Sequence, residues 1–185
     1  PREELCMNEL KMKMRLEREA ALTGSQNDAY LFLEVEAPKD ERADSLESKR
    51  LELALVLDVS GSMAGAPIEA AKDAARRLVN GIGEKDRLAL VTFDSHVSTV
   101  CGLKEMTSKN RKDVIAAIDR LESGSMTHLH GGWREAATGL LEGGPGDETI
   151  RRIVLLSDGH ANVGITDPTT LGHEAGQMAA KGVYT

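Results

Sequence analysis

The hydrophobic positions along the chain form two different patterns, one before residue 50 and one after it. Between Leu10 and Leu16 apolar residues alternate with charged ones, which is typical of a half-buried antiparallel strand. A turn-rich segment at 23–28 follows, and then the run YLFLEVE at 30–36 predicts a second strand. The first pattern therefore predicts a β-hairpin.

The segment between the two patterns is almost wholly polar. PKDERADSLESKR at 38–50 has nothing to bury, which indicates an exposed linker and a domain boundary near residue 50. We expect three parts, which are a hairpin segment over 1–38, a charged linker over 39–50 and a larger domain over 51–185.

After the linker, continuous apolar runs alternate with helical periodicity. LELALVL (51–57), RLALVTF (87–93) and RIVLLS (152–157) are typical of strands covered by helices on both faces, and VSTVCGL (97–103) predicts an antiparallel edge strand. The predicted helical faces are Ile68, Ala71, Ala75, Leu78 and Ile82; Val114, Ala117, Ile118 and Leu121; and Trp133, Ala136, Ala137, Leu140 and Leu141. This alternation predicts an α/β fold with a doubly wound, mostly parallel sheet and helices on both faces.

Single residues predict where helices begin. Pro67 is expected at the first helical position, and Ser108 is expected to cap the next helix. Asp167 and Pro168 form an N-cap and N1 pair for the last helix. Another core strand is expected to begin at Val183.

Composition and charge narrow the choice of partner. The chain has 23 Lys plus Arg against 30 Asp plus Glu, and its net charge of −7 argues against nucleic acid and anionic membranes, so protein partners are expected. No apolar run reaches the roughly 18 residues of a membrane span.

Cys6 and Cys101 suggest neither a zinc site nor a disulfide framework, and they fit a reducing compartment, so we expect a cytoplasmic location. The chain begins at Pro1, so a signal or anchor could precede it.

Small oxygen-bearing side chains follow predicted strands at three places. The candidate metal ligands are Asp58, Ser60 and Ser62 in the first loop, Thr127 in the second and Asp158 in the third. Hard oxygen ligands suit Mg²⁺, with Mn²⁺ or Ca²⁺ possible in its place. Two carboxylates roughly balance the charge of the ion, and neutral hydroxyls leave it electrophilic. The pattern therefore predicts a binding site that an anionic oxygen from outside completes.

The same motifs carry a family resemblance across 51–185. DVSGSM, LVTFDSHV, the Thr127 loop and LLSDGHANVGITDP resemble the von Willebrand factor A (VWA) domain family, its bacterial members especially, and its metal-ion-dependent adhesion site (MIDAS). The resemblance implies a Rossmann-like VWA fold, with Ser60 and Ser62 as direct ligands and with Thr127 and Asp158 binding directly or through water. It also implies a non-enzymatic adhesion or assembly module, whose Mg²⁺ coordinates an Asp or Glu side chain of a protein partner.

The resemblance has implications for both ends of the chain. The family fold continues beyond the strand at Val183 with a helix, a final strand and a last helix, so the domain over 51–185 is expected to be incomplete at its C-terminus. In several family members the domain is inserted into a β-sandwich. The segment 1–38 would then supply the first strands of such a sandwich.

Two other functions stay open. Asp58 could act as the nucleophile of a Mg²⁺-dependent phosphoryl-transfer enzyme, although haloacid-dehalogenase-like phosphatases need a second Asp where Ser60 stands. The P-loop motif G-x-x-x-x-G-K-[ST] is also absent from the sequence. A purely structural scaffold would show no metal dependence.

Three histidines and an aspartate lie near the candidate ligands in the sequence. The spacing of His128 and His130 could suggest zinc, but no further His or Cys cluster accompanies them. We interpret these two, together with His160, as loop residues at the rim of the site. Asp94 is interpreted as a turn or surface residue, and Trp133 as the core anchor of its helix.

Overall fold

The structure, a computed structural model, describes residues 11–16, 31–36, 49–143, 149–159 and 161–185. Contacts within the chain divide it into two units, Pro1–Ser48 and Lys49–Thr185, and each is described by itself.

The first unit contains the hairpin. β1 (Lys11–Leu16) pairs antiparallel with β2 (Leu31–Glu36), and Met14 lies opposite Leu33. The alternating pattern therefore predicted the pairing correctly. The turn-rich segment at 23–28 and most of the charged linker lie outside the described residues, and the place of the hairpin in a β-sandwich stays a prediction.

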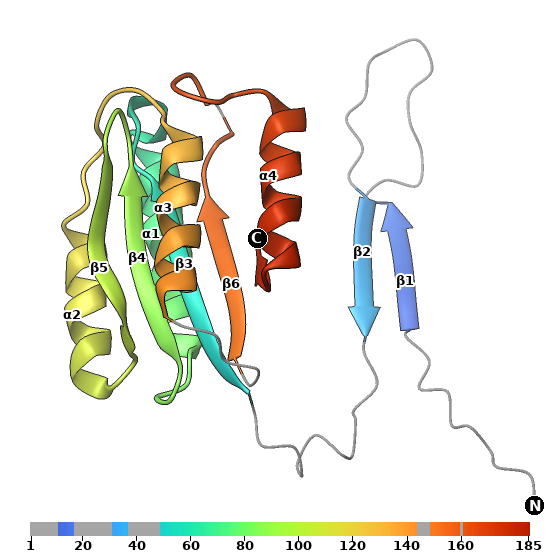
Figure 1. The fold of residues 1–185 in the computed structure, drawn as a ribbon, viewed down its shortest axis with the longest axis vertical. Helices are drawn as coiled ribbons and strands as arrows, with labels where there is room; N and C mark the ends of the chain where they lie inside the picture. Colours follow the sequence, from blue (N-terminus) through green and yellow to red (C-terminus); the bar gives the residue numbers. More distant parts are fainter. Residues whose placement is uncertain (1–10, 17–30, 37–48, 144–148, 160) are drawn as a thin grey trace, which may run out of the picture. The chain divides into compact units, whose positions relative to one another are not determined.

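The second unit is built on a sheet whose described strands have the order β5-β4-β3-β6-β7. The strands are β3 (Arg50–Asp58), β4 (Arg87–Phe93), β5 (Val97–Glu105), β6 (Thr149–Leu156) and β7 (Val183–Tyr184). β3 pairs parallel with both β4 and β6, and β7 continues parallel to β6. β5 is the antiparallel edge strand beside β4, as expected (Figure 1). The sheet is thus mixed and mostly parallel.

Helices cover both faces of this sheet, which confirms the doubly wound α/β prediction. α1 (Ala66–Gly81) and α2 (Ser108–Asp119) pack on one face, and α3 (Leu129–Glu142) and α4 (Pro168–Ala180) lie on the other (Figure 1). A short 3₁₀ turn, η1 (Gly61–Met63), precedes α1. In the described part of the chain, no helix is long and apolar enough to cross a membrane.

The central strand β3 contributes to both cores. Leu53, Leu55 and Leu57 belong to the core under α1 and α2. Ala54 and Val56, which alternate with them, belong to the core under α3. Because successive residues of a strand point to opposite faces, a strand covered on both sides must be apolar at nearly every position. This explains the continuous run LELALVL.

Glu52 is the exception within this apolar run, and it is buried. Its Oε1 accepts a hydrogen bond from Arg87 Nη1 at 2.9 Å, and its Oε2 accepts one from Arg151 Nε at 3.2 Å. A buried carboxylate is tolerated only when it is paired and hydrogen-bonded. The two arginines come from β4 and β6, so the ion pairs connect three adjacent strands near their amino ends.

Some details of the helices differ from the predictions. In α1 the buried residue that follows Ala75 is Val79, because the helical repeat brings residues four positions apart to the same face. The predicted core residue Leu78 is only half-buried. Leu121 lies beyond the end of α2.

Pro67 follows Ala66, so it is the second residue of its helix and not the first. Asp167 is confirmed as the N-cap of α4, where its side chain accepts from Thr170 N at 2.8 Å.

The predicted cap of α2 was wrong by one residue. Ser108 is already helical, and the N-cap is Thr107, whose backbone is extended (φ −56°, ψ 158°). Thr107 Oγ1 accepts a hydrogen bond from Asn110 N at 3.3 Å, which satisfies one of the free donors of the first turn. The hydroxyl of Ser108 instead donates to Glu84 Oε1 at the surface.

This assignment predicts different effects for two neighbouring substitutions. Thr107→Ala should lower the free energy of unfolding by about 1 kcal/mol, because it removes the cap. Ser108→Ala should change it by less than about 0.5 kcal/mol, as is usual for an exposed position. Urea titrations followed by circular dichroism measure both, and a larger effect at Ser108 than at Thr107 would contradict the cap.

Candidate functional site

The candidate site lies at the carboxyl end of the central strand, where the first two predicted loops meet. Asp58 ends β3 and is fully buried, as is Ser60 two residues later. Gly61 N donates to Ser125 O at 2.6 Å, and Gly124 N donates to Val59 O at 2.5 Å. These two backbone contacts hold the loop that follows β3 against the loop that precedes α3.

The carboxylate of Asp58 is held by donors from two different loops. Its Oδ1 accepts from Ser60 N at 2.9 Å, and its Oδ2 accepts from Ser157 Oγ at 2.6 Å. Ser157 Oγ in turn accepts from Gly159 N at 3.0 Å, so it bridges the buried carboxylate and the loop after β6. A carboxylate has about four acceptor positions, so one donor on each oxygen leaves capacity for a cation.

The two serine hydroxyls of the first loop lie together. Ser60 Oγ and Ser62 Oγ are 3.1 Å apart, and Ser62 is exposed while Ser60 is buried. Gly61 between them approaches the second loop closely, since a Cβ there would lie 3.1 Å from Ser125 O. The hydroxyls of Ser60 and Ser62 thus flank Gly61, where a side chain would crowd the backbone of Ser125.

Thr127 is buried and connects the second loop to the third. Its backbone N donates to Asn162 Oδ1 at 2.8 Å, and its carbonyl oxygen accepts from Asn162 N at 3.2 Å and from Val163 N at 3.1 Å. Asp158 is exposed on the third loop, directly after Ser157. Thus Asp58, Ser60 and Ser62 are brought together by direct contacts, while Thr127 and Asp158 are carried to the same edge of the sheet by their loops.

Sequence reasoning missed three residues that hold these loops in place. Ser157 and Asn162 are the connections just described. Asp94 does lie in a turn, as predicted, but its carbonyl oxygen also accepts from His128 N at 2.7 Å. Moreover, a Cβ at Gly124 would overlap Asp94 Oδ2, so the close approach of this carboxylate requires glycine there. Ser157 and Asn162 lie in the motif LLSDGHANVGITDP and Asp94 lies in LVTFDSHV, so their place in these motifs is the signal that could have identified them.

The structure contradicts the prediction for one of the three histidines. His130 is not a loop residue at the rim: it belongs to α3, its side chain is 8% exposed, and its Nε2 lies 2.9 Å from Glu174 Oε2. Its ring also lies near that of Trp133, which is buried as predicted. His128 does lie at the N-cap of α3, packed against Gly131 and Gly164, and His160 falls outside the described residues.

The donor set of the site is one of oxygens. Carboxylates and hydroxyls are the ligands that Mg²⁺ and similar hard cations prefer, so the residues present fit such an ion chemically. Within the described ranges, no group of three or more His, Cys, Asp or Glu side chains is arranged to hold a metal. A metal at this site would therefore depend on the hydroxyl groups as well as on the carboxylates.

Comparison with known sequences identifies a family. The profile of the von Willebrand factor type A domain matches residues 53–160. The Synechocystis protein sll0103 is 36% identical over 118 residues, which are 63% of this chain and 27% of that protein. YfbK of Escherichia coli is 28% identical over 165 residues, covering 85% of this chain and 27% of that protein. A plant relative, the Arabidopsis E3 ubiquitin-protein ligase WAV3, is 29% identical, and the match covers 65% of this chain and 16% of the ligase. The chain thus spans about a quarter, or less, of these relatives.

Solved structures share the fold at lower identity. A von Willebrand factor type A protein from Catenulispora acidiphila has a TM-score of 0.60 at 19% identity, covering 97% of this chain and 40% of that one. Proximal thread matrix protein 1 of the mussel byssus, with a zinc-occupied MIDAS motif, has a TM-score of 0.58 at 23% identity, covering 72% and 36%. The vWF domain of the type V pili tip protein Mfa5 from Porphyromonas gingivalis has a TM-score of 0.53 at 24% identity, covering 66% and 44%.

The contact between His130 and Glu174 generates a prediction about pH. The hydrogen bond from His130 lowers the pKa of Glu174 below its ordinary value of 4.5. A lowered pKa in the folded state stabilises the fold above the unfolded-state pKa, and this stabilisation is lost as the pH falls through the folded-state value. Glu174→Gln should therefore lower the urea midpoint at pH 7 and have a smaller effect at pH 3.

The control for this experiment is Glu122→Gln, which changes an exposed glutamate after α2. It should shift the midpoint little at either pH. If the effect of Glu174→Gln were the same at pH 7 and pH 3, the ionised carboxylate of Glu174 would not contribute through this contact.

Proposed function

The chain belongs to the von Willebrand factor type A domain family, and from this we propose that it is a protein-binding module that uses a bound Mg²⁺ to hold an acidic side chain of its partner. Domains of this family mediate protein adhesion and assembly. The residues that would hold the ion are Asp58, Ser60, Ser62, Thr127 and Asp158. Mn²⁺ or Ca²⁺ could take its place.

The observation that carries the proposal is the buried carboxylate of Asp58, which is held by donors from the loops after β3 and β6, beside the neighbouring hydroxyls of Ser60 and Ser62. Ser60 N and Ser157 Oγ fix both oxygens of this carboxylate, at 2.9 and 2.6 Å. The neighbouring hydroxyls of Ser60 and Ser62 are 3.1 Å apart. Oxygen donors that the fold already holds in place lose little conformational entropy when a cation binds, which favours binding.

Burial divides the five residues into two groups. Asp58, Ser60 and Thr127 are buried, so they are suited to hold an ion from within the domain. Ser62 and Asp158 are exposed, so they lie where a partner can approach. When bound, the ion supplies positive charge that attracts an external carboxylate, because two protein carboxylates only balance its charge and the hydroxyls are neutral.

An enzymatic role is the weaker alternative. A phosphoryl-transfer mechanism with Asp58 as nucleophile needs a nearby acid or base, and the position two residues on holds Ser60, whose hydroxyl faces Ser62. The relative WAV3 is named a ligase, but the match covers only 16% of that protein, so its name does not make this domain an enzyme. We therefore propose that this domain binds and does not catalyse.

The first test compares metal binding and partner binding in matched variants. Asp58→Asn and the double variant Ser60→Ala plus Ser62→Ala should each weaken Mg²⁺ binding at least about 100-fold in calorimetry, because each removes at least about 3 kcal/mol of coordination. Capture of a protein partner from a cell extract should require Mg²⁺ and be lost with EDTA and in both variants.

The control is Ser98→Ala plus Ser108→Ala, which changes two exposed serines outside the three loops. Circular dichroism verifies that each variant is folded. Undiminished Mg²⁺ affinity in folded forms of both site variants would exclude the proposed ligands. Partner capture that EDTA does not affect would favour a scaffold, whereas phosphatase turnover lost in Asp58→Asn would favour the enzyme.

A second prediction concerns Ser157, which touches Asp58 and is not one of the proposed ligands. Ser157→Ala removes the hydrogen bond to Asp58 Oδ2 and the acceptor for Gly159 N. A hydrogen bond to a charged group contributes about 1.5–3 kcal/mol, so Mg²⁺ affinity should fall at least about tenfold. Ser157→Thr keeps the hydroxyl and should restore most of the affinity; equal affinities in wild type and Ser157→Ala would rule out this positioning role.

A further inference from the structure

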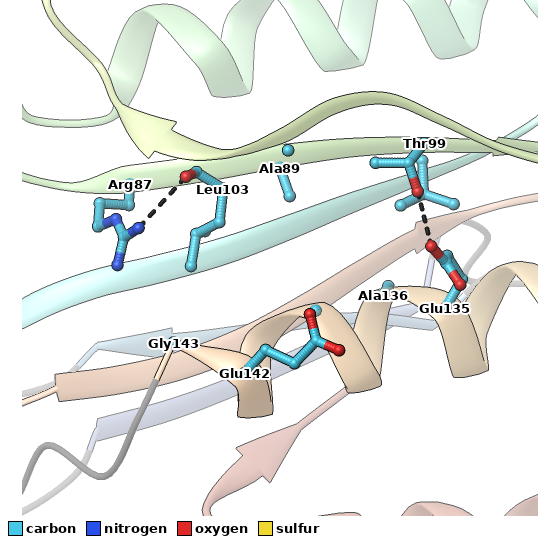
Figure 2. A pocket seen from close by; sticks show the side chains of 11 residues that line it. Arg87, Ala89, Thr99, Leu103, Glu135, Ala136, Glu142 and Gly143 are labelled. Atoms are coloured by element: carbon cyan, nitrogen blue, oxygen red, sulfur yellow. Dashed lines mark hydrogen bonds between the residues drawn. The ribbon is translucent and has the colours of Figure 1, made fainter.

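A second candidate site lies away from the metal loops, between the edge of the sheet and a helix. A cavity of about 310 Å³ separates β4 and the edge strand β5 from α3 (Figure 2). Ala89, Val91 and Ala136 form a buried apolar floor, and Leu103 contributes a further apolar wall. Its volume lies at the lower end of the range for ligand pockets.

Two of the residues that line the cavity are glycines with open space beside them. Gly102 in β5 and Gly139 in α3 both line it, and a Cβ built on either meets no atom within 4 Å. Neither glycine has a positive φ, so the backbone does not require glycine at these positions. Glycine in the middle of a helix costs about 1 kcal/mol relative to alanine. In a strand, glycine often marks a place where another group approaches closely.

The rim of the cavity is acidic, and one of its carboxylates is not engaged. Glu135 and Glu142 come from α3, and Glu135 Oε1 accepts from Thr99 Oγ1 at 2.8 Å (Figure 2). Among the described residues, no hydrogen bond or ion pair engages the Glu142 carboxylate. Arg87 also lines the cavity, and its guanidinium donates to Glu52 Oε1 at 2.9 Å and to Leu103 O at 3.3 Å. Because Arg151 pairs with the same Glu52, three carboxylates (Glu52, Glu135 and Glu142) stand against two guanidinium groups, and one net negative charge remains.

We propose that this cavity is a docking site for a lysine side chain of a protein partner. The four-carbon stem of lysine would lie on the apolar floor, and its ammonium group would pair with Glu142 at the rim, as long basic side chains do on mixed surfaces. An acidic side chain would be repelled, and an aliphatic one would leave the Glu142 charge unpaired. The cavity thus complements a basic residue, whereas the metal site complements an acidic one, and neither site depends on the other.

The test uses the whole chain and a pair of small probes, N-acetyl-lysine methylamide and its uncharged analogue N-acetyl-norleucine methylamide. Amide resonances are followed by ¹⁵N NMR in EDTA, so a failure of the metal site cannot affect the result. The lysine probe should cause saturable shifts at Gly102, Leu103 and Gly139. The norleucine probe should bind about threefold more weakly, which is the difference expected for an ion pair with the exposed Glu142 carboxylate.

Three variants make the test specific. Gly139→Leu fills the cavity and should abolish the shifts at Gly102 and Leu103, while Gly176→Leu makes the same change in α4, where a Cβ also meets no atom within 4 Å, and should not. Glu142→Gln should weaken the lysine probe to the level of the norleucine probe. Equal binding of the two probes, no saturable shifts, or full lysine binding in a folded Gly139→Leu variant would overturn the proposal.

Discussion

The structure depends on the burial of the central strand β3 on both of its faces. Its hydrogen bonds run to parallel neighbours on either side, and alternate residues belong to the two cores. Such a strand is stable only if helices cover both faces, which imposes the alternation of strand and helix along the chain. The same arrangement places its last residue, Asp58, at the carboxyl edge of the sheet, where it is fully buried.

The candidate metal site follows from that placement, because a buried carboxylate must find hydrogen-bond donors. Asp58 finds them in two loops, through Ser60 N and Ser157 Oγ. Asn162 then connects the third loop to Thr127 with hydrogen bonds in both directions. Oxygen-bearing side chains that are separated by up to 100 residues in sequence therefore share one edge of the sheet. These hydrogen bonds hold the Asp58 carboxylate in place, which supports the proposal that a small, hard cation binds there.

The fold could be predicted from the sequence because its strongest signals are local. Continuous apolar runs identified β3, β4 and β6, and alternation identified the hairpin, since buried area depends directly on such patterns. Features that depend on the backbone conformation of a single residue, such as where a helix begins, were predicted less accurately. Thr107 caps α2 in place of Ser108, because either hydroxyl could accept the bond but the backbone is extended at Thr107 and already helical at Ser108. His130 looked like a loop residue, but α3 begins before it and buries it against α4.

The sequence by itself determined the family, the α/β architecture and the choice of Asp58, Ser60, Ser62, Thr127 and Asp158 as candidate ligands, because residue type and spacing along each loop are enough to suggest this chemistry. Only the tertiary structure decided how the loops are held together through Ser157, Asn162 and Asp94. It alone placed Gly102 and Gly139 on opposite walls of one cavity. Contacts between distant segments depend on packing in three dimensions, which no local pattern specifies.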